Sequence, residues 1–174
     1  SYNSADQFLE QATDLRPGCV LLDVKMPGKS GLELFCDIRR QGMLLPVIFL
    51  SGHGDIEMAV QALHDGAFDF LVKPAEPERL IEKVQKAVEY GKKIRSQAQE
   101  QEEIKTLMAR LTPSELEVAQ LMAKGLTVKA IAQLLKVSEQ AIKAHRSSIY
   151  HKLDVINPVE VAGVVNDWLR SRKI

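Results

Sequence analysis

Hydrophobic positions in the first half of the chain form short continuous runs, separated by longer stretches with helical spacing. The continuous runs are residues 19–22, 46–50 and 68–72. Runs of this length with few polar positions are typical of strands that are buried on both faces of a sheet. The stretches with helical spacing are residues 4–11, 32–40, 55–64 and 78–91. This alternation predicts a parallel α/β domain over residues 1–91.

The spacing also predicts the inward faces of three of these helices. The inward residues are Leu32, Phe35 and Cys36, with Ile38 beside them, in residues 32–40; Ile56, Ala59, Val60 and Leu63 in residues 55–64; and Leu80, Ile81, Val84, Ala87 and Val88 in residues 78–91. The other cysteine of the chain, Cys19, opens the first strand. The two cysteines do not have the spacing of metal ligands. The pattern therefore predicts two buried, reduced thiols.

From Thr112 onward the pattern is helical only. Thr112, Pro113 and Glu115 are an N-cap, a proline at the first helical position and a capping-box acid, which predict a helix up to Gly125. Three further helices are predicted at residues 128–135, 138–153 and 158–170. They predict an all-α four-helix domain with a helix-turn-helix over residues 111–174. The polar residues 92–110 are expected to form a linker helix or a loose coiled coil.

The formal net charge of zero conceals an asymmetry between these segments. Residues 1–90 carry 14 acids and 9 bases, residues 91–110 carry 3 acids and 5 bases, and residues 111–174 carry 6 acids and 9 bases. With 45% hydrophobic and 26% charged residues, the composition excludes a disordered chain or a disulfide scaffold. No apolar run approaches the ~20 residues of a membrane span, and no signal peptide is visible, so we expect a cytoplasmic protein.

Three polar side chains fall at or just after the carboxyl ends of the three predicted strands: Asp23, Ser51 and Lys73. Sites of parallel α/β sheets lie at this edge, so these residues are expected to come together. A carboxylate that accepts a phosphoryl group needs a hydroxyl and an ammonium for the phosphoryl oxygens, and a cation to offset charge. The three residues supply the carboxylate, the hydroxyl and the ammonium.

The segments around these residues are LLDVKMPGKSG at residues 21–31, FLSGHGD at 49–55 and GAFDFLVKP at 66–74. With them, residues 1 to about 90 resemble the receiver domain of bacterial response regulators, which implies a flavodoxin-like, doubly wound parallel sheet. By this resemblance Asp23 is the phosphoacceptor and the Lys25 carbonyl helps to hold Mg²⁺. Ser51 and Phe70 are the switch residues, and Lys73 pairs with a phosphoryl oxygen.

The resemblance is incomplete before Asp23. The acidic pair with which the family binds Mg²⁺ has no counterpart among Asp6, Glu10 and Asp14. The resemblance implies that the first two strands and the first helix are missing, an N-terminal truncation. We therefore expect Mg²⁺ binding and phosphorylation of this chain to be weak or absent, and the strand of Asp23 to be an exposed sheet edge that risks instability or exchange with another chain.

The second half carries LTPSE at residues 111–115, GLT at 125–127, KAIA at 129–132, VS at 137–138, IKAHR at 142–146 and KL at 152–153. It resembles the LuxR/FixJ-type DNA-binding domain. At about 100° per residue, Ile142, Ile149 and Leu153 share one face of the third helix. The residues on the opposite face are Gln140, Lys143, Ala144, Ser147 and His151. Small and polar side chains of this kind suit a helix that enters the major groove.

We expect base-edge contacts from Lys143, Ala144 and Ser147. The residues expected at phosphates are Lys129, Arg146, Ser148 and Lys152, although Arg146 lies close to the core face by the same angular count. His145 could meet a phosphate or pack half-buried. In the last helix, the stripe of Val161, Val165 and Trp168 could form a dimer surface or face the core.

Together these features indicate a two-component response regulator and transcription factor of the LuxR/FixJ type, rather than an enzyme. The expected partners are a sensor histidine kinase, double-stranded promoter DNA and a second copy of the chain. The two copies are expected to pair through residues 55–66 and the following strand. RNA polymerase is a further possible partner. The alternative is a phosphorylation-independent DNA-binding protein with a degenerate receiver. A third possibility is a phosphatase of the haloacid dehalogenase type, which also uses an aspartate at a strand end. That enzyme type needs a second aspartate two residues later, and this chain has Lys25 there, which argues against it.

Overall fold

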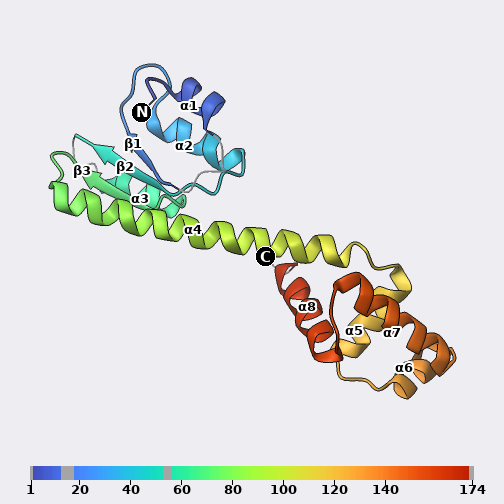
Figure 1. Cartoon of the computed structure of the whole chain (residues 1–174). Coiled ribbons are helices and arrows are strands. Elements are labelled where there is room, and N and C mark those ends of the chain that lie inside the picture. The colour runs from blue at the N-terminus through green and yellow to red at the C-terminus, as the bar shows by residue number, and fades with distance from the viewer. Residues whose placement is uncertain (1, 13–17, 53–55, 173–174) are drawn as a thin grey trace. The chain divides into compact units, whose positions relative to one another are not determined.

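The computed structural model describes residues 2–12, 18–52 and 56–172, and the chain divides into two compact units, Ser1–Ser96 and Gln97–Ile174. The first unit alternates strands and helices, and the second is all helical (Figure 1). This confirms the two fold classes that the hydrophobic pattern predicts. Residue 55, the expected start of a helix, lies outside the described residues.

The first unit is built on a parallel sheet in the order β1-β2-β3 (Figure 1). Its elements are α1 (Ala5–Gln11), β1 (Val20–Asp23), α2 (Gly31–Arg40), β2 (Val47–Ser51), α3 (Ile56–His64), β3 (Asp69–Val72) and the first part of α4 (Pro77–Met108). In the strand register Asp23 pairs with Leu50, and Ser51 pairs with Val72. The carboxyl ends of the three strands are therefore level with one another.

Helices cover both faces of this sheet, as a doubly wound fold requires. In the central strand β2, Val47 and Phe49 belong to a core that contains residues of α1, α2 and α3. The intervening Ile48 packs in a second core with Ala87 of α4. Among the described residues β1 pairs with β2 alone, and its Leu21 is 43% exposed. The expectation that β1 is a sheet edge is met within this part of the chain.

The expected inward faces of α2 and α3 were partly wrong. On α2 the buried side chains are Leu34, Phe35 and Ile38, and Cys36 is exposed because it projects from the opposite side of the helix. On α3 the buried residue is Ala62, whereas Val60 and Leu63 are 61% and 44% exposed. Val60 and Leu63 thus face outward, and the thiol of Cys36 is not a core group.

Helix α4 is continuous over 32 residues, where the sequence suggested a helix that ends near Gly91 and a separate linker segment. The division between the two units falls after Ser96, inside this helix. At its carboxyl end Met108 is buried in the core of the second unit, with Ile104 and Leu107 packed against that core. None of the described helices, α4 included, is long and apolar enough to span a membrane.

The second unit packs four further helices on the end of α4: α5 (Pro113–Ala123), α6 (Val128–Leu135), α7 (Glu139–Leu153) and α8 (Pro158–Ser171). Each begins at a side chain that accepts a hydrogen bond from a backbone N–H of the first turn, and these caps are Thr112, Thr127, Ser138 and Asn157. Val161 and Val165 of α8 are fully buried in the common core, and Trp168 packs against it. The stripe on α8 is therefore a core face and not a dimer surface.

Candidate functional site

The residues predicted at the sheet edge lie on three neighbouring strands. Asp23 ends β1, Ser51 ends β2, and Lys73 follows β3 directly. The Lys73 ammonium donates to Asp23 Oδ2 at 2.5 Å, and the Lys73 backbone N–H donates to the Ser51 carbonyl at 2.6 Å. The structure thus brings a carboxylate and an ammonium into contact at the carboxyl edge of the sheet, beside the end of the central strand.

The Asp23 carboxylate is accessible and ionised. Its side chain is 40% exposed, and Oδ1 also accepts from the backbone N–H of Lys25 at 3.2 Å. The hydrogen bond from Lys73 is the main reason that the pKa of Asp23 lies below its ordinary value. An exposed carboxylate that is held in its anionic form can act as a nucleophile at neutral pH.

The two expected switch residues have different environments. Ser51 is 6% exposed, whereas Phe70 of β3 is half-buried, with its ring 6.5 Å from that of Phe49 between centroids. In the parallel register Phe70 lies opposite Phe49. The switch roles of Ser51 and Phe70 stay predictions.

A second candidate site is the outer face of α7. Ile142, Ile149 and Leu153 are at most 2% exposed, which confirms the predicted core face. The residues of the opposite face are all exposed: Gln140, Lys143, Ala144, Ser147 and His151. A helix with one buried apolar face and one exposed face of small and polar side chains can enter the major groove of DNA.

A buried carboxylate holds α7 against α5. Glu115 is 5% exposed; its Oε1 accepts from the Ser148 hydroxyl at 2.6 Å, and its Oε2 accepts from the Lys152 ammonium at 2.6 Å and the Thr112 N–H at 2.7 Å. Burial raises the pKa of this carboxyl, but hydrogen bonds from Lys152, Ser148 and Thr112 outweigh it and lower the pKa to about 2. Glu115 is thus an ionised group in the core of the unit.

This arrangement bears on three expected phosphate contacts, Ser148, Lys152 and Arg146, which stay predictions. The polar atoms of Ser148 and Lys152 are directed inward to Glu115, so they are not presented with the outer face of α7. Arg146 is half-buried and donates to the Tyr150 hydroxyl at 2.8 Å, which also turns it from that face. Lys129 is exposed at the start of α6, and its expected phosphate contact stays a prediction.

Comparison with known proteins covers both units. The family of response regulator receiver domains matches residues 1–85, and the luxR family of bacterial regulatory proteins matches residues 109–165. The transcriptional regulatory protein TdiR of Thauera aromatica is 37% identical over 153 residues, which are 88% of this chain and 67% of that protein. The response regulator protein TmoT of Ectopseudomonas mendocina is 36% identical over 172 residues, 99% of this chain and 78% of that protein.

The chain belongs to the response regulators with a LuxR-family DNA-binding domain. The fold agrees with this assignment, because the structure of the response regulator StyR matches with a TM-score of 0.85 at 34% identity, over 95% of this chain and 83% of that one. The transcriptional regulatory protein FixJ of Bradyrhizobium diazoefficiens is 32% identical over 172 residues, 95% of this chain and 84% of that protein.

Receiver domains of response regulators use Mg²⁺, and the residues of this site fit that ion poorly. Mg²⁺ prefers six oxygen ligands and takes them from carboxylates, phosphates and water. Asp23 offers one carboxylate, but its Oδ2 is already paired with Lys73. The described residues contain no group of three or more His, Cys, Asp and Glu side chains that could hold a metal. The metal roles of Asp23 and of the Lys25 carbonyl stay predictions.

Gly31 is a further residue beside the site, to which the sequence pattern assigns no role. It begins α2, its N–H donates to the Val24 carbonyl at 3.0 Å, and a Cβ at this position would overlap the Asp23 carbonyl oxygen. The absence of a side chain therefore lets α2 approach β1 at Asp23. The sequence signal for this close approach was the glycine directly before the predicted helix of residues 32–40.

We expect Gly31→Ala to destabilise the receiver unit by about 2 kcal/mol, because backbone atoms at Asp23 must shift to admit the methyl group. The free energy of unfolding, measured in urea, checks this. Gly18→Ala is the matched control, since a Cβ there meets no atom within 4 Å. Equal urea midpoints for Gly31→Ala and Gly18→Ala would show that the close approach of Gly31 to Asp23 does not affect the stability of the receiver unit.

Proposed function

We propose that Asp23 of this response regulator accepts a phosphoryl group from a sensor histidine kinase, and that the phosphorylated protein binds promoter DNA through the outer face of α7. The observation that carries the first part is the direct pair between Asp23 and Lys73 at the carboxyl edge of the sheet. An anionic carboxylate beside a fixed ammonium provides both the nucleophile and a partner for the charge that arrives.

In the proposed transfer, an oxygen of the Asp23 carboxylate attacks the phosphorus of a phosphohistidine. The new O–P bond forms as the P–N bond breaks, and the electron pair of the broken bond stays on the imidazole, which takes up a proton. The product is an acyl phosphate on Asp23. Lys73 then exchanges its bond to the carboxylate for one to a phosphoryl oxygen, since the phosphoryl group carries more negative charge.

A homodimer is supported by the outward face of α3 and β3. Val60 and Leu63 on α3 and Val72 on β3 are 61%, 44% and 47% exposed, and α3 packs beside β3. Covering three large apolar side chains on adjoining elements with a second surface removes apolar area from water, which stabilises the complex. We assign this surface to the pairing of two receivers after phosphorylation. Two DNA-binding units would then reach two half-sites, where RNA polymerase is the further partner.

On DNA we assign Lys143, Ala144 and Ser147 to base edges and Lys129 to a phosphate. The three α7 residues are exposed on consecutive turns of one face, and Lys129 lies at the start of the preceding helix. Residues 111–174 carry only three more bases than acids, which gives modest non-specific affinity. Dimerisation therefore supplies much of the affinity for a specific site.

We expect Lys143→Ala to weaken specific DNA binding by at least about tenfold, because it removes a charged donor from the base-reading face. Fluorescence anisotropy with a fragment that the wild-type protein selects from random-sequence DNA measures this at fixed salt. Lys124→Ala is the control, because Lys124 is exposed at the end of α5 and not on α7.

The same titration tests control by phosphorylation. Prior incubation with the phosphodonor acetyl phosphate is expected to tighten binding by the wild-type protein and to leave an Asp23→Asn variant unchanged. Equal affinity of the wild-type protein for DNA with and without the donor would favour the alternative, a DNA-binding protein that does not depend on phosphorylation. The poor fit of the site to Mg²⁺ supports the same alternative.

A further inference from the structure

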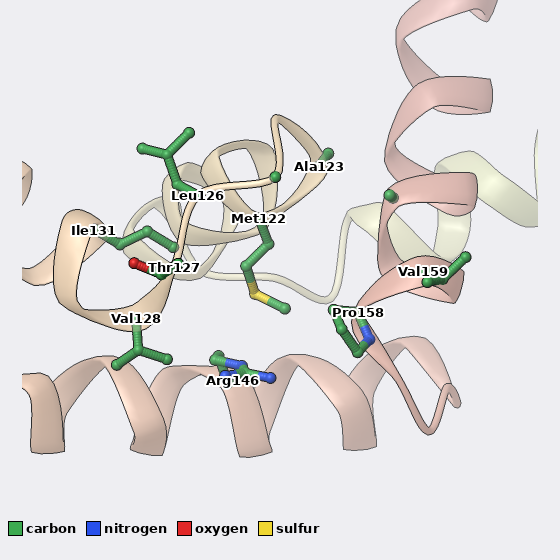
Figure 2. Close-up of a pocket in the computed structure, with 11 residues that line it drawn as sticks. Met122, Ala123, Leu126, Thr127, Val128, Ile131, Arg146, Pro158 and Val159 are labelled. Carbon is green, nitrogen blue, oxygen red and sulfur yellow. The ribbon is translucent and has the colours of Figure 1, made fainter.

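The DNA-binding unit contains a pocket that the proposed function does not use. It has a volume of about 420 Å³ and lies where the end of α5, the starts of α6 and α8, and the middle of α7 meet (Figure 2). This volume is within the range of about 300–1,000 Å³ that small-molecule sites occupy. Its apolar walls are Met122, Leu126, Val128, Ile131, Pro158 and Val159.

Arg146 is the one charged residue among those that line this pocket. Figure 2 shows it on α7 between Val128 and Pro158, with Met122 pointing toward it from α5. One of its terminal nitrogens donates to the Tyr150 hydroxyl, but a guanidinium has five N–H donors in a planar fork. Donors are therefore left for a second acceptor, and an anion is the acceptor that a half-buried guanidinium favours.

Other groups at the pocket have the same preference. Both α6 and α8 begin there, so the positive ends of two helix dipoles lie beside the guanidinium. The Thr127 oxygen accepts from the Ala130 N–H, which leaves the hydroxyl hydrogen for a ligand acceptor. An anionic head group is thus favoured at the Arg146 end, while the walls offer only apolar contacts to the rest of a ligand.

We propose that this pocket binds a small apolar carboxylic acid. The carboxylate would take the free edge of the Arg146 guanidinium in a two-hydrogen-bond pair, and the ring or branched chain would fill the space between Met122, Val128 and Pro158. Inorganic phosphate matches only the charge, because it has no apolar surface to bury. A neutral apolar molecule matches only the walls and leaves the guanidinium without an anion.

Such a ligand would act directly on the DNA-reading helix. Arg146 is one residue from Ser147 on α7, and Val128 is one residue from Lys129 on α6, so a wedged ligand adjusts the spacing of the two helices of the helix-turn-helix. Because coupling between two ligands is reciprocal, the acid and specific DNA change each other's affinity by the same factor. This regulation is independent of phosphorylation at Asp23.

The test uses sodium benzoate as probe on the full chain labelled with ¹⁵N. We expect saturable shifts of the amide signals of Gly125, Thr127 and Val128, and at least tenfold weaker binding of benzyl alcohol, which has the same ring and no charge. Arg146→Met should weaken benzoate binding at least tenfold. Arg170→Met is the matched control, because Arg170 lies on the exposed face of α8 and pairs with Asp167.

A second variant keeps the test decisive if Arg146→Met perturbs the fold. Ala162→Phe fills the pocket from α8 without removing a charge, and it should abolish benzoate binding while circular dichroism and the melting temperature stay near wild type. The proposal is overturned if benzoate gives no saturable shifts at millimolar concentration, or if benzyl alcohol or inorganic phosphate binds as well as benzoate. It is also overturned if a folded Ala162→Phe chain binds benzoate normally.

Discussion

An Asp23→Asn variant is expected to take up no phosphoryl group from acetyl phosphate or from a phosphorylated sensor kinase. The amide has no negative charge with which to attack phosphorus, and its nitrogen cannot replace the acceptor oxygen. Lys73→Met should retain the nucleophile but slow the transfer by at least about tenfold, because the ammonium at 2.5 Å no longer offsets the incoming charge. Phosphate-affinity gels measure both.

The control for this pair is Asp65→Asn. Asp65 is an exposed acid of the same unit and follows the end of α3. Its Oδ1 accepts a hydrogen bond from the Gln61 side-chain amide. It should be phosphorylated like the wild type. Label that persists on the Asp23→Asn chain would place the acceptor elsewhere and remove the basis of the proposed control.

Glu115→Ala is expected to lower the free energy of unfolding of the DNA-binding unit by about 3 kcal/mol, the lower part of the range for removing one partner of a buried ion pair. The loss leaves the Lys152 ammonium, the Ser148 hydroxyl and the Thr112 N–H without their acceptor. Urea unfolding followed by fluorescence of Trp168, the single tryptophan, reports on this unit. Glu117→Ala, an exposed acid two residues on, should change stability by at most about 0.5 kcal/mol.

The same carboxylate predicts a pH dependence. Its folded pKa of about 2 is below the ordinary 4.5, so its contribution is fully present above about pH 4.5 and is lost as pH falls toward 2. The wild-type unit should therefore lose stability more steeply across this range than Glu115→Gln, which cannot titrate. Identical slopes for the two proteins would exclude Glu115 as the titrating group.

The sequence was sufficient where one local pattern decides the structure. The apolar run around Ile48 predicts a strand that is buried on both faces, and Val47, Ile48 and Phe49 of β2 are fully buried. The same prediction is wrong for β1 and β3, the outer strands of the described sheet, whose Leu21 and Val72 are 43% and 47% exposed. On α7 the angular positions of Ile142 and Ile149 separate the core from the outer face without knowledge of any partner helix. The contact between Asp23 and Lys73 followed in the same way, because parallel strands place their carboxyl ends together.

The sequence was insufficient where a distant group decides. Ser148 and Lys152 look like solvent-facing DNA contacts until Glu115, 33 and 37 residues earlier, is placed opposite them. Val60 shows the other limit: helical spacing identifies an apolar stripe, but it does not distinguish residues that face the core from residues that are exposed. For α4, the sequence predicted a helix to about Gly91 and a linker helix or loose coiled coil after it, but not that the two form one unbroken helix.

The outward position of Cys36 makes the receiver unit easy to mark with a dye. The chain has two cysteines, both free, and Cys19 is half-buried with a pKa that burial raises above its ordinary value. Because the thiolate is the reactive form, a maleimide at neutral pH should modify Cys36 well before Cys19. A single fluorophore can therefore be attached to α2, the helix that begins against Asp23, without substituting any residue.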